Sequence, residues 1–128
     1  MVRPVTPSFD PAILVTDGRS ATLISASCPE CDAVMFPRRP HCARCGSQTQ
    51  DSHLPATGVV RSYCRGTLPL PGTEPPVTLV RVELSPQVIV QGVMDGAVEI
   101  GDRVAVVARP IADGAETCTG FGFTRSAS

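Results

Sequence analysis

The sequence alternates between short apolar stretches and turn-forming residues along much of its length. The clearest stretch is residues 78–84, in which Val80, Val82 and Leu84 alternate with polar or charged residues. Alternation with a period of two is typical of a strand that buries one face and exposes the other. We therefore expect a strand here, with these three apolar side chains in the core.

Four further stretches after the cysteine-rich region have strand character as well, and turns rich in glycine, proline and aspartate separate them. They cover residues 58–64, 88–94, 103–108 and 117–124. Five short strands at this spacing predict a small β-barrel or a β-sandwich.

The segment before the cysteine-rich region contains two more apolar stretches, residues 12–16 and 21–25. They flank an Asp-Gly pair at residues 17–18, which is a turn signal and predicts a short hairpin. An Asp-Pro pair at residues 10–11 favours a helical turn instead, because proline is well placed at the start of a helix. The lead-in segment, residues 1–27, is therefore expected to form a short hairpin or a helix.

Four of the six cysteines follow one another with the spacing C-x2-C-x10-C-x2-C. Two C-x-x-C knuckles are the pattern by which a chain brings four thiolates around one tetrahedral zinc ion. Gly46, directly after the second knuckle, provides the conformational freedom that a tight turn needs. We predict one structural zinc per chain in a zinc ribbon at residues 28–52, which is too small to fold on its own core. The predicted ligands are Cys28, Cys31, Cys42 and Cys45.

Three alternatives compete with a four-cysteine zinc site. A disulfide framework fits a secreted chain, but the N-terminus lacks the apolar core of a signal peptide, so we expect a reducing, cytoplasmic setting. The stretch also echoes the zinc deaminases, yet four thiolates leave no open position for a catalytic water. His41 in place of Cys42 stays open as a less favoured ligand.

The charge composition excludes several functions. All 11 basic residues are arginine, which rules out Schiff-base lysines and the lysine of a phosphate-binding loop. With 12 acidic residues the net charge is -1, which is weak support for binding nucleic acid through its phosphates. No apolar run approaches the ~20 residues that a membrane span needs, so we expect no membrane association.

Catalytic residues are not evident in the sequence. Cys64 and Cys118 lie in strand-like segments, and no histidine occurs from residue 57 onward to act as their base. We expect both to be small buried apolar side chains. A stand-alone enzyme that uses one of these thiols is the weaker alternative.

Motifs from about residue 23 to residue 123 occur in a characteristic order. They are the four-cysteine ribbon with Phe36-Pro37 and Arg39, Gly-Val-Val-x-Ser-Tyr at 58–63, Val-x-Val-Glu-Leu at 80–84, and Ile-Gly-Asp-x-Val-x-Val at 100–106. In this order they closely resemble the zinc-ribbon/OB-fold acyl-CoA-associated family, long catalogued as a domain of unknown function. The resemblance implies a mostly β fold, with an N-terminal rubredoxin-like zinc ribbon followed by a five-stranded OB-fold barrel over residues 53–128.

The resemblance also implies a function. Members of that family look like non-catalytic partners of thiolase-fold proteins, among them steroid side-chain aldolases, acyltransferases and archaeal enzymes of the hydroxymethylglutaryl-CoA route. We therefore expect an accessory subunit, in a hetero-oligomer with a thiolase-like protein, that helps admit or position an acyl-CoA substrate. A single-stranded nucleic-acid-binding protein is the alternative, although OB-folds stack bases on aromatic rings and this chain has one tyrosine and no tryptophan.

Arginine and aromatic side chains are the candidates for contacts with coenzyme A or with the partner. Arginine suits this role because its fork-shaped guanidinium forms charge-assisted hydrogen bonds with phosphates. Phe36 is expected either to pack the ribbon against the barrel or to contact the partner. Many relatives carry Thr-x-x-His after the Ser-Tyr motif, where this chain has residues 64–67 without a histidine. The candidates are Phe36, Arg38, Arg39, Arg61, Tyr63 and Arg65.

Overall fold

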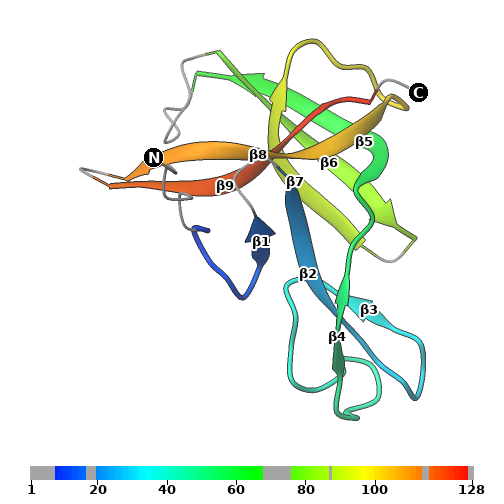
Figure 1. Ribbon diagram of the computed structural model, residues 1–128. Coiled ribbons are helices and arrows are strands. Elements are labelled where there is room, and N and C mark those ends of the chain that lie inside the picture. Colours follow the sequence, from blue (N-terminus) through cyan, green and yellow to red (C-terminus); the bar gives the residue numbers. More distant parts are fainter. Residues whose placement is uncertain (1–7, 17–19, 68–75, 87, 114–115, 127–128) are drawn as a thin grey trace.

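A computed structural model describes residues 8–16, 20–67, 76–86, 88–113 and 116–126. Regular structure in these ranges is entirely β, and no helix that could span a membrane occurs among them. A small sheet and a closed barrel are joined end to end (Figure 1). The small sheet consists of β1 (Leu14–Thr16), β2 (Ala21–Ser27), β3 (Val34–Met35) and β4 (Gln50–His53). The barrel consists of β5 (Thr57–Gly66), β6 (Val77–Ser85), β7 (Val88–Asp95), β8 (Arg103–Asp113) and β9 (Glu116–Arg125).

The barrel has the strand order β5-β6-β7-β9-β8, and β8 pairs with β5 to close it. Neighbouring strands are antiparallel except β7 and β9, which run parallel and pair only at Met94–Phe123 and Asp95–Thr124. A five-stranded barrel with one short seam of this kind is an OB-fold. The predicted fold class is confirmed, and of the two alternatives from periodicity the barrel is correct.

The core of the barrel follows the alternation seen in the sequence. Val80 and Val82 are fully buried on β6, Leu84 is 4% exposed, and Arg81 between them is exposed. Each buried valine or leucine stabilises the fold by about 1.5–3 kcal/mol relative to an exposed one. Phe123 of β9 completes this core beside the seam, where a side chain at Gly92 of β7 would collide with its ring.

The lead-in segment contains elements of both expected forms. The carbonyl of Asp10 accepts hydrogen bonds from the N–H groups of Ile13 and Leu14, which makes one tight turn. β1 begins at Leu14 and pairs antiparallel with β2, with Leu14 opposite Leu23. The Asp-Gly turn expected at residues 17–18 lies outside the described residues.

Strand β2 belongs to both halves of the molecule. Its first half pairs with β1, and its second half pairs with β3 and β4 (Figure 1). Leu23 of β2 and Leu54, which follows β4, are buried in the same cluster as the barrel valines. The ribbon and the barrel are therefore joined through one continuous apolar core. The expected boundaries between lead-in, ribbon and barrel stay predictions.

The free edge of β9 beyond the seam is covered by the N-terminal side of the lead-in. The Phe9 N–H donates a hydrogen bond of 2.8 Å to the Thr119 carbonyl, and Ser8 forms a bridge to the same residue. The rings of Phe9 and Phe121 lie 6.4 Å apart, within the range of favourable aromatic pairs. Lead-in residues thus cover part of an edge that β7 leaves unpaired.

Candidate functional site

The two cysteine knuckles have the same backbone geometry. In the first, the Cys28 N–H donates to the Ala33 carbonyl and the Asp32 N–H donates to the Cys28 carbonyl, both at 2.9 Å. The residue after the second cysteine of this knuckle, Asp32, has a φ of 62°. Non-glycine residues rarely adopt this left-handed conformation, and aspartate is among those that tolerate it best. The first knuckle therefore closes on an aspartate, which the sequence did not reveal.

The second knuckle repeats this pattern further along the chain. The Cys42 N–H donates to the Ser47 carbonyl at 2.8 Å, and the Gly46 N–H donates to the Cys42 carbonyl at 2.9 Å. Gly46 has a φ of 79°, so the expected need for glycine at this turn is confirmed. Each turn directs its two sulfurs toward the sulfurs of the other knuckle.

The four cysteine sulfurs converge on one point. All lie within 4.8 Å of one another, with Cys28 Sγ 3.5 Å from Cys45 Sγ and Cys31 Sγ 3.6 Å from Cys42 Sγ. Four sulfurs at the usual Zn–S distance of about 2.3 Å sit about 3.8 Å apart at the corners of a tetrahedron. The cluster therefore fits one zinc ion with every position filled, which makes the zinc structural rather than catalytic.

The competing interpretations of these cysteines do not fit the geometry. All six cysteines lie in described parts of the chain and are free thiols, and a disulfide would need an S–S distance of about 2.05 Å. His41 is exposed and is not part of the cluster. The disulfide framework is therefore excluded for the described state, and four sulfurs complete the site without the histidine.

Hydrogen bonds prepare the second knuckle to bind metal. The backbone N–H groups of Cys45 and Arg44 lower the pKa of Cys42, the latter at 3.3 Å from its sulfur. The hydroxyl and N–H of Ser47 lower the pKa of Cys45 to about 6. Zinc binds thiolates, so these groups favour the ligand form of both cysteines at neutral pH.

Cys31 behaves in the opposite way. The Ala33 N–H lowers its pKa, but burial and the crowded thiols of Cys42, Cys28 and Cys45 outweigh this effect and raise the pKa to about 12. Four thiolates cannot be gathered in one place without a cation. Zinc binding must therefore displace the proton of this thiol, and the ribbon forms in full only with its metal.

The ribbon has little core of its own. Its separate cluster consists of Cys28, Ala33 and Cys42, with Cys31 and Met35 packed against it. Phe36 is half-buried and packs instead against the main core. Of the two roles expected for Phe36, the contacts support packing of the ribbon on the barrel.

Three of the candidate arginines lie apart from the barrel mouth. Arg38 pairs with Asp51 of β4, and Arg39 lies beside it in a shallow groove of about 380 Å³ on the ribbon. Arg61 pairs with Glu83 at 2.8 Å, and this carboxylate raises the pKa of the guanidinium. Exposed pairs of this kind contribute roughly 0–1 kcal/mol to stability.

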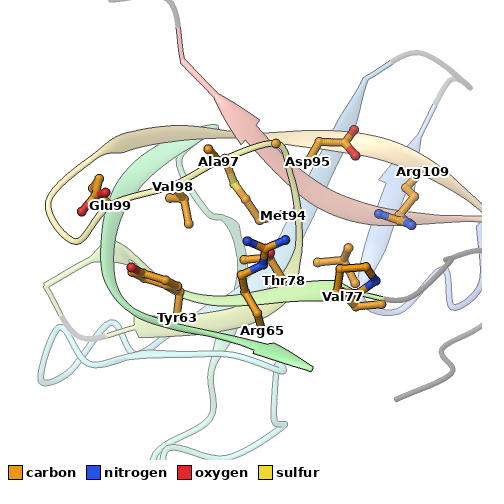
Figure 2. A pocket seen from close by; sticks show the side chains of 13 residues that line it. Tyr63, Arg65, Val77, Thr78, Met94, Asp95, Ala97, Val98, Glu99 and Arg109 are labelled. Atoms are coloured by element: carbon orange, nitrogen blue, oxygen red, sulfur yellow. The ribbon is translucent and has the colours of Figure 1, made fainter. Parts of the chain in front are cut away.

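Tyr63 and Arg65 do come together, in a cleft at one end of the barrel (Figure 2). Both are on β5, where a bulge between Val60 and Ser62 shifts the pairing with β6 by one residue. The shift reverses which side chains face inward, so Tyr63 and Arg65 point to the mouth of the barrel. The cleft has a volume of about 690 Å³.

Comparisons with known proteins agree with this architecture. Residues 22–50 match the family model described as the ChsH2 rubredoxin-like zinc ribbon domain. A solved structure described as "Ltp2-ChsH2(DUF35) aldolase" is similar with a TM-score of 0.64 and 27% identity, covering 81% of this chain and 84% of that chain. The expected family resemblance is confirmed. A search of curated proteins found no match.

The ChsH2-type ribbon match spans all four predicted ligands but stops before the barrel, so it says nothing of the cleft. Sequence reasoning missed Arg109 and Thr78, which also line the cleft. Arg109 lies on β8, far along the chain from Arg65, and only the closure of the barrel brings them to one site. Spacing along the chain carries no signal for such a pair.

The expectation for Cys64 is wrong. Its side chain is exposed, whereas Cys118 is half-buried. The bulge in β5 explains the error, because unbroken alternation from Val60 would have turned Cys64 inward and Tyr63 outward. The two histidines of the sequence, His41 and His53, lie on the ribbon, so the exposed thiol of Cys64 has no imidazole beside it.

Proposed function

We propose that the chain is a non-catalytic accessory subunit of a thiolase-like aldolase or acyltransferase. The observation that carries this proposal is the similarity over four-fifths of the chain to a component of an Ltp2-ChsH2(DUF35) aldolase. That structure is named as an aldolase of two components, Ltp2 and ChsH2. The ChsH2-type zinc ribbon of this chain supports the role of the ChsH2 component over that of the other.

The side chains of this chain support a role without chemistry of its own. Its zinc site is a closed set of four thiolates, which leaves no position for a water or a substrate oxygen. The sequence contains no lysine, and both histidines lie on the ribbon, away from the barrel cleft. A lysine nucleophile, a histidine base near the cleft and an open metal site are therefore lacking, and the partner would supply the reaction.

We further propose that the complex acts on a coenzyme A thioester in a reducing, cytoplasmic setting, with the breakdown of steroid side chains as the candidate pathway. Exposed arginines on the ribbon and at the barrel mouth support a negatively charged ligand, because guanidinium forks bind phosphates with two parallel hydrogen bonds. The thiolate ligands of the zinc support a reducing compartment. The chain would help admit or position the thioester at the active site of its partner, in a hetero-oligomer.

Co-purification tests the partner role. The tagged chain would be co-expressed with a thiolase-fold protein encoded beside its gene, and the eluate would be sized by gel filtration with light scattering. We expect one species that contains both proteins in a fixed ratio. Elution as two separate species at micromolar concentrations would contradict the proposal.

A pair of cysteine variants controls for folding of the ribbon. Cys42→Ala removes a predicted zinc ligand, whereas Cys64→Ala removes an exposed thiol on the barrel. If the ordered ribbon is needed for docking or for a soluble chain, Cys42→Ala loses the complex and Cys64→Ala retains it. Equal behaviour of the two variants would show that the ribbon is dispensable for association.

A further inference from the structure

Arg65 stands in the middle of the barrel cleft, with its guanidinium directed into the open space (Figure 2). Among the described residues its side chain has no ion-pair or hydrogen-bond partner. Three other arginines, by contrast, are matched with carboxylates. These pairs are Arg38 with Asp51, Arg61 with Glu83, and Arg125 with Asp102. Arg65 is thus a positive charge in a concave site, and none of the described carboxylates forms an ion pair with it.

A second guanidinium reaches the same cleft from another strand. Arg109 of β8 extends across β9 at Gly122, where a Cβ atom would lie 3.5 Å from its Cδ and 3.9 Å from its Nη1. These are ordinary van der Waals distances, so the Arg109 side chain lies directly against this part of β9. Figure 2 shows the Arg109 guanidinium at the opposite side of the cleft from Tyr63, with Arg65 between them.

The walls of the cleft suit an organic ligand rather than a bare ion. Its volume of about 690 Å³ lies within the range of about 300–1,000 Å³ that is typical of small-molecule sites. Apolar side chains, including Met94 and Val98, line it beside the Tyr63 ring, which is 41% exposed. Thr78 and Tyr63 add hydroxyl groups that donate hydrogen bonds to an anion.

Two carboxylates limit where an anion fits. Asp95 and Glu99 also line the cleft, and Figure 2 shows both near its rim, with Arg65 closer to the centre. A hydrogen bond of 2.9 Å from the Glu99 N–H to the Asp102 carboxylate holds the loop that carries Glu99. Negative charge is disfavoured beside these two carboxylates and favoured beside Arg65, so an anionic group would fit best next to Arg65.

We propose that this cleft binds a phosphate group of a small organic molecule, with Arg65 as the main contact and Arg109 as the second. The inference deepens the proposed function and rests on it only for the natural ligand, since coenzyme A carries a diphosphate and a ribose phosphate. Inorganic pyrophosphate presents the same phosphate chemistry without the organic part. Both ligands can therefore be tested on the chain alone, without a partner.

Calorimetric titration of the zinc-loaded full chain at low ionic strength would test the site with pyrophosphate, coenzyme A and citrate. We expect one saturable site for both phosphate ligands and weaker binding of citrate, which carries carboxylates only. Arg65→Gln should weaken phosphate binding at least about tenfold, because a charge-assisted hydrogen bond is worth about 1.5–3 kcal/mol. Arg65→Lys should lose less, because it keeps the charge but not the fork.

Arg81→Gln is the matched control, because Arg81 is an exposed arginine on the outer face of β6. The Arg81→Gln variant should bind both phosphate ligands as tightly as the unchanged chain does. The Arg109→Gln variant should bind them more weakly. The zinc content should be the same in all variants. Absence of saturable binding for both phosphate ligands would overturn the proposal. An equal loss of phosphate affinity in Arg81→Gln and Arg65→Gln would also overturn it, as would citrate that binds as tightly as pyrophosphate.

The two phosphate ligands separate this inference from the proposed function. Binding of pyrophosphate but not of coenzyme A would support the phosphate site and overturn its link to a coenzyme A thioester. Binding of both ligands by a chain that fails to co-elute with a thiolase-fold partner would support the site and contradict the partner role.

Discussion

Ser47 shows how single residues that are not predicted ligands prepare the zinc centre. Its hydroxyl and N–H lower the pKa of Cys45 from an ordinary value near 9 to about 6, so Cys45 is mostly thiolate at neutral pH. Ser47→Ala removes the hydroxyl but keeps the N–H, so the pKa of Cys45 should rise part of the way toward its ordinary value, and zinc must then displace more proton at pH 7. We expect zinc affinity to fall about tenfold at pH 7, the low end of the usual effect of groups that support metal ligands.

Competition with a chromophoric chelator would measure this loss across the pH range. The difference between Ser47→Ala and the unchanged chain should be largest near pH 6, should shrink as the pH rises toward 9, and should disappear at higher pH, where Cys45 is ionised in both. Ser62→Ala, on the barrel, is the control. Equal zinc affinities at pH 7 would show that the Ser47 hydroxyl does not support the site.

The left-handed turn at Gly46 makes a second prediction at this scale. A β-branched side chain at its φ of 79° costs about 1–2 kcal/mol, and the strain falls directly on the second knuckle. Gly46→Val should therefore release zinc to a chelator faster than the unchanged chain. Gly66→Val is a matched control, because a Cβ atom at Gly66 would meet nothing within 4 Å and the backbone there is not left-handed. Equal release rates in the two variants would contradict this explanation.

Among the elements, β2 has the largest structural role because it joins the ribbon to the barrel. Leu23 is 1% exposed and packs in the main core, while the end of the same strand pairs with the ribbon strands β3 and β4. Leu23→Ala should lower the free energy of unfolding by about 2–5 kcal/mol, as buried leucines do. Val15→Ala on β1, at a side chain 53% exposed, should change it by less than about 0.5 kcal/mol.

Urea unfolding followed by two probes would check both the size and the coupling of this effect. Tyr63 is the only tyrosine and reports on the barrel, and zinc release reports on the ribbon. If β2 couples the two parts, Leu23→Ala should shift both transitions to lower urea. A shift in the tyrosine signal alone would show that the ribbon is stabilised independently.

Periodicity predicted the strands well because their buried faces are local patterns. Val80, Val82 and Leu84 lie inward as expected, since the alternation along β6 is unbroken between them. It failed on β5, where one bulge at residues 60–62 exchanges the faces that carry Tyr63 and Cys64. A bulge depends on the pairing of two strands, which spacing along one strand does not encode.

Residues of the candidate sites could likewise be predicted where they depend on local spacing, and were missed where they depend on contacts between distant strands. The zinc ligands follow from spacing, because each knuckle is a turn of a few residues. Arg65 and Arg109 meet only after β5 and β8 close the barrel, so the sequence indicated one of them and missed the other. Asp32 is a local feature that was missed, since aspartate is less characteristic of this turn than glycine.

For the whole molecule, removal of zinc should affect the two halves differently. The separate cluster of the ribbon buries only small side chains, whereas the barrel side chains belong to the much larger main core. A chain stripped by a strong chelator should keep well-dispersed amide resonances for the barrel and lose those of residues 28–50. Metal analysis should find one zinc per chain before stripping, and none or much less in Cys42→Ala. A metal-free chain with an unchanged spectrum would contradict the structural role of the zinc.

The chain as a whole is proposed to shape a reaction that its partner performs. The most direct measurement of this role is turnover of acyl-CoA substrates by three preparations, namely the chain alone, the thiolase-fold partner alone, and the two together, assayed for cleavage, condensation and acyl transfer. We predict no turnover by the chain, little by the partner, and robust turnover by the pair. Robust turnover by the chain alone, or undiminished activity of the partner without it, would contradict the accessory role.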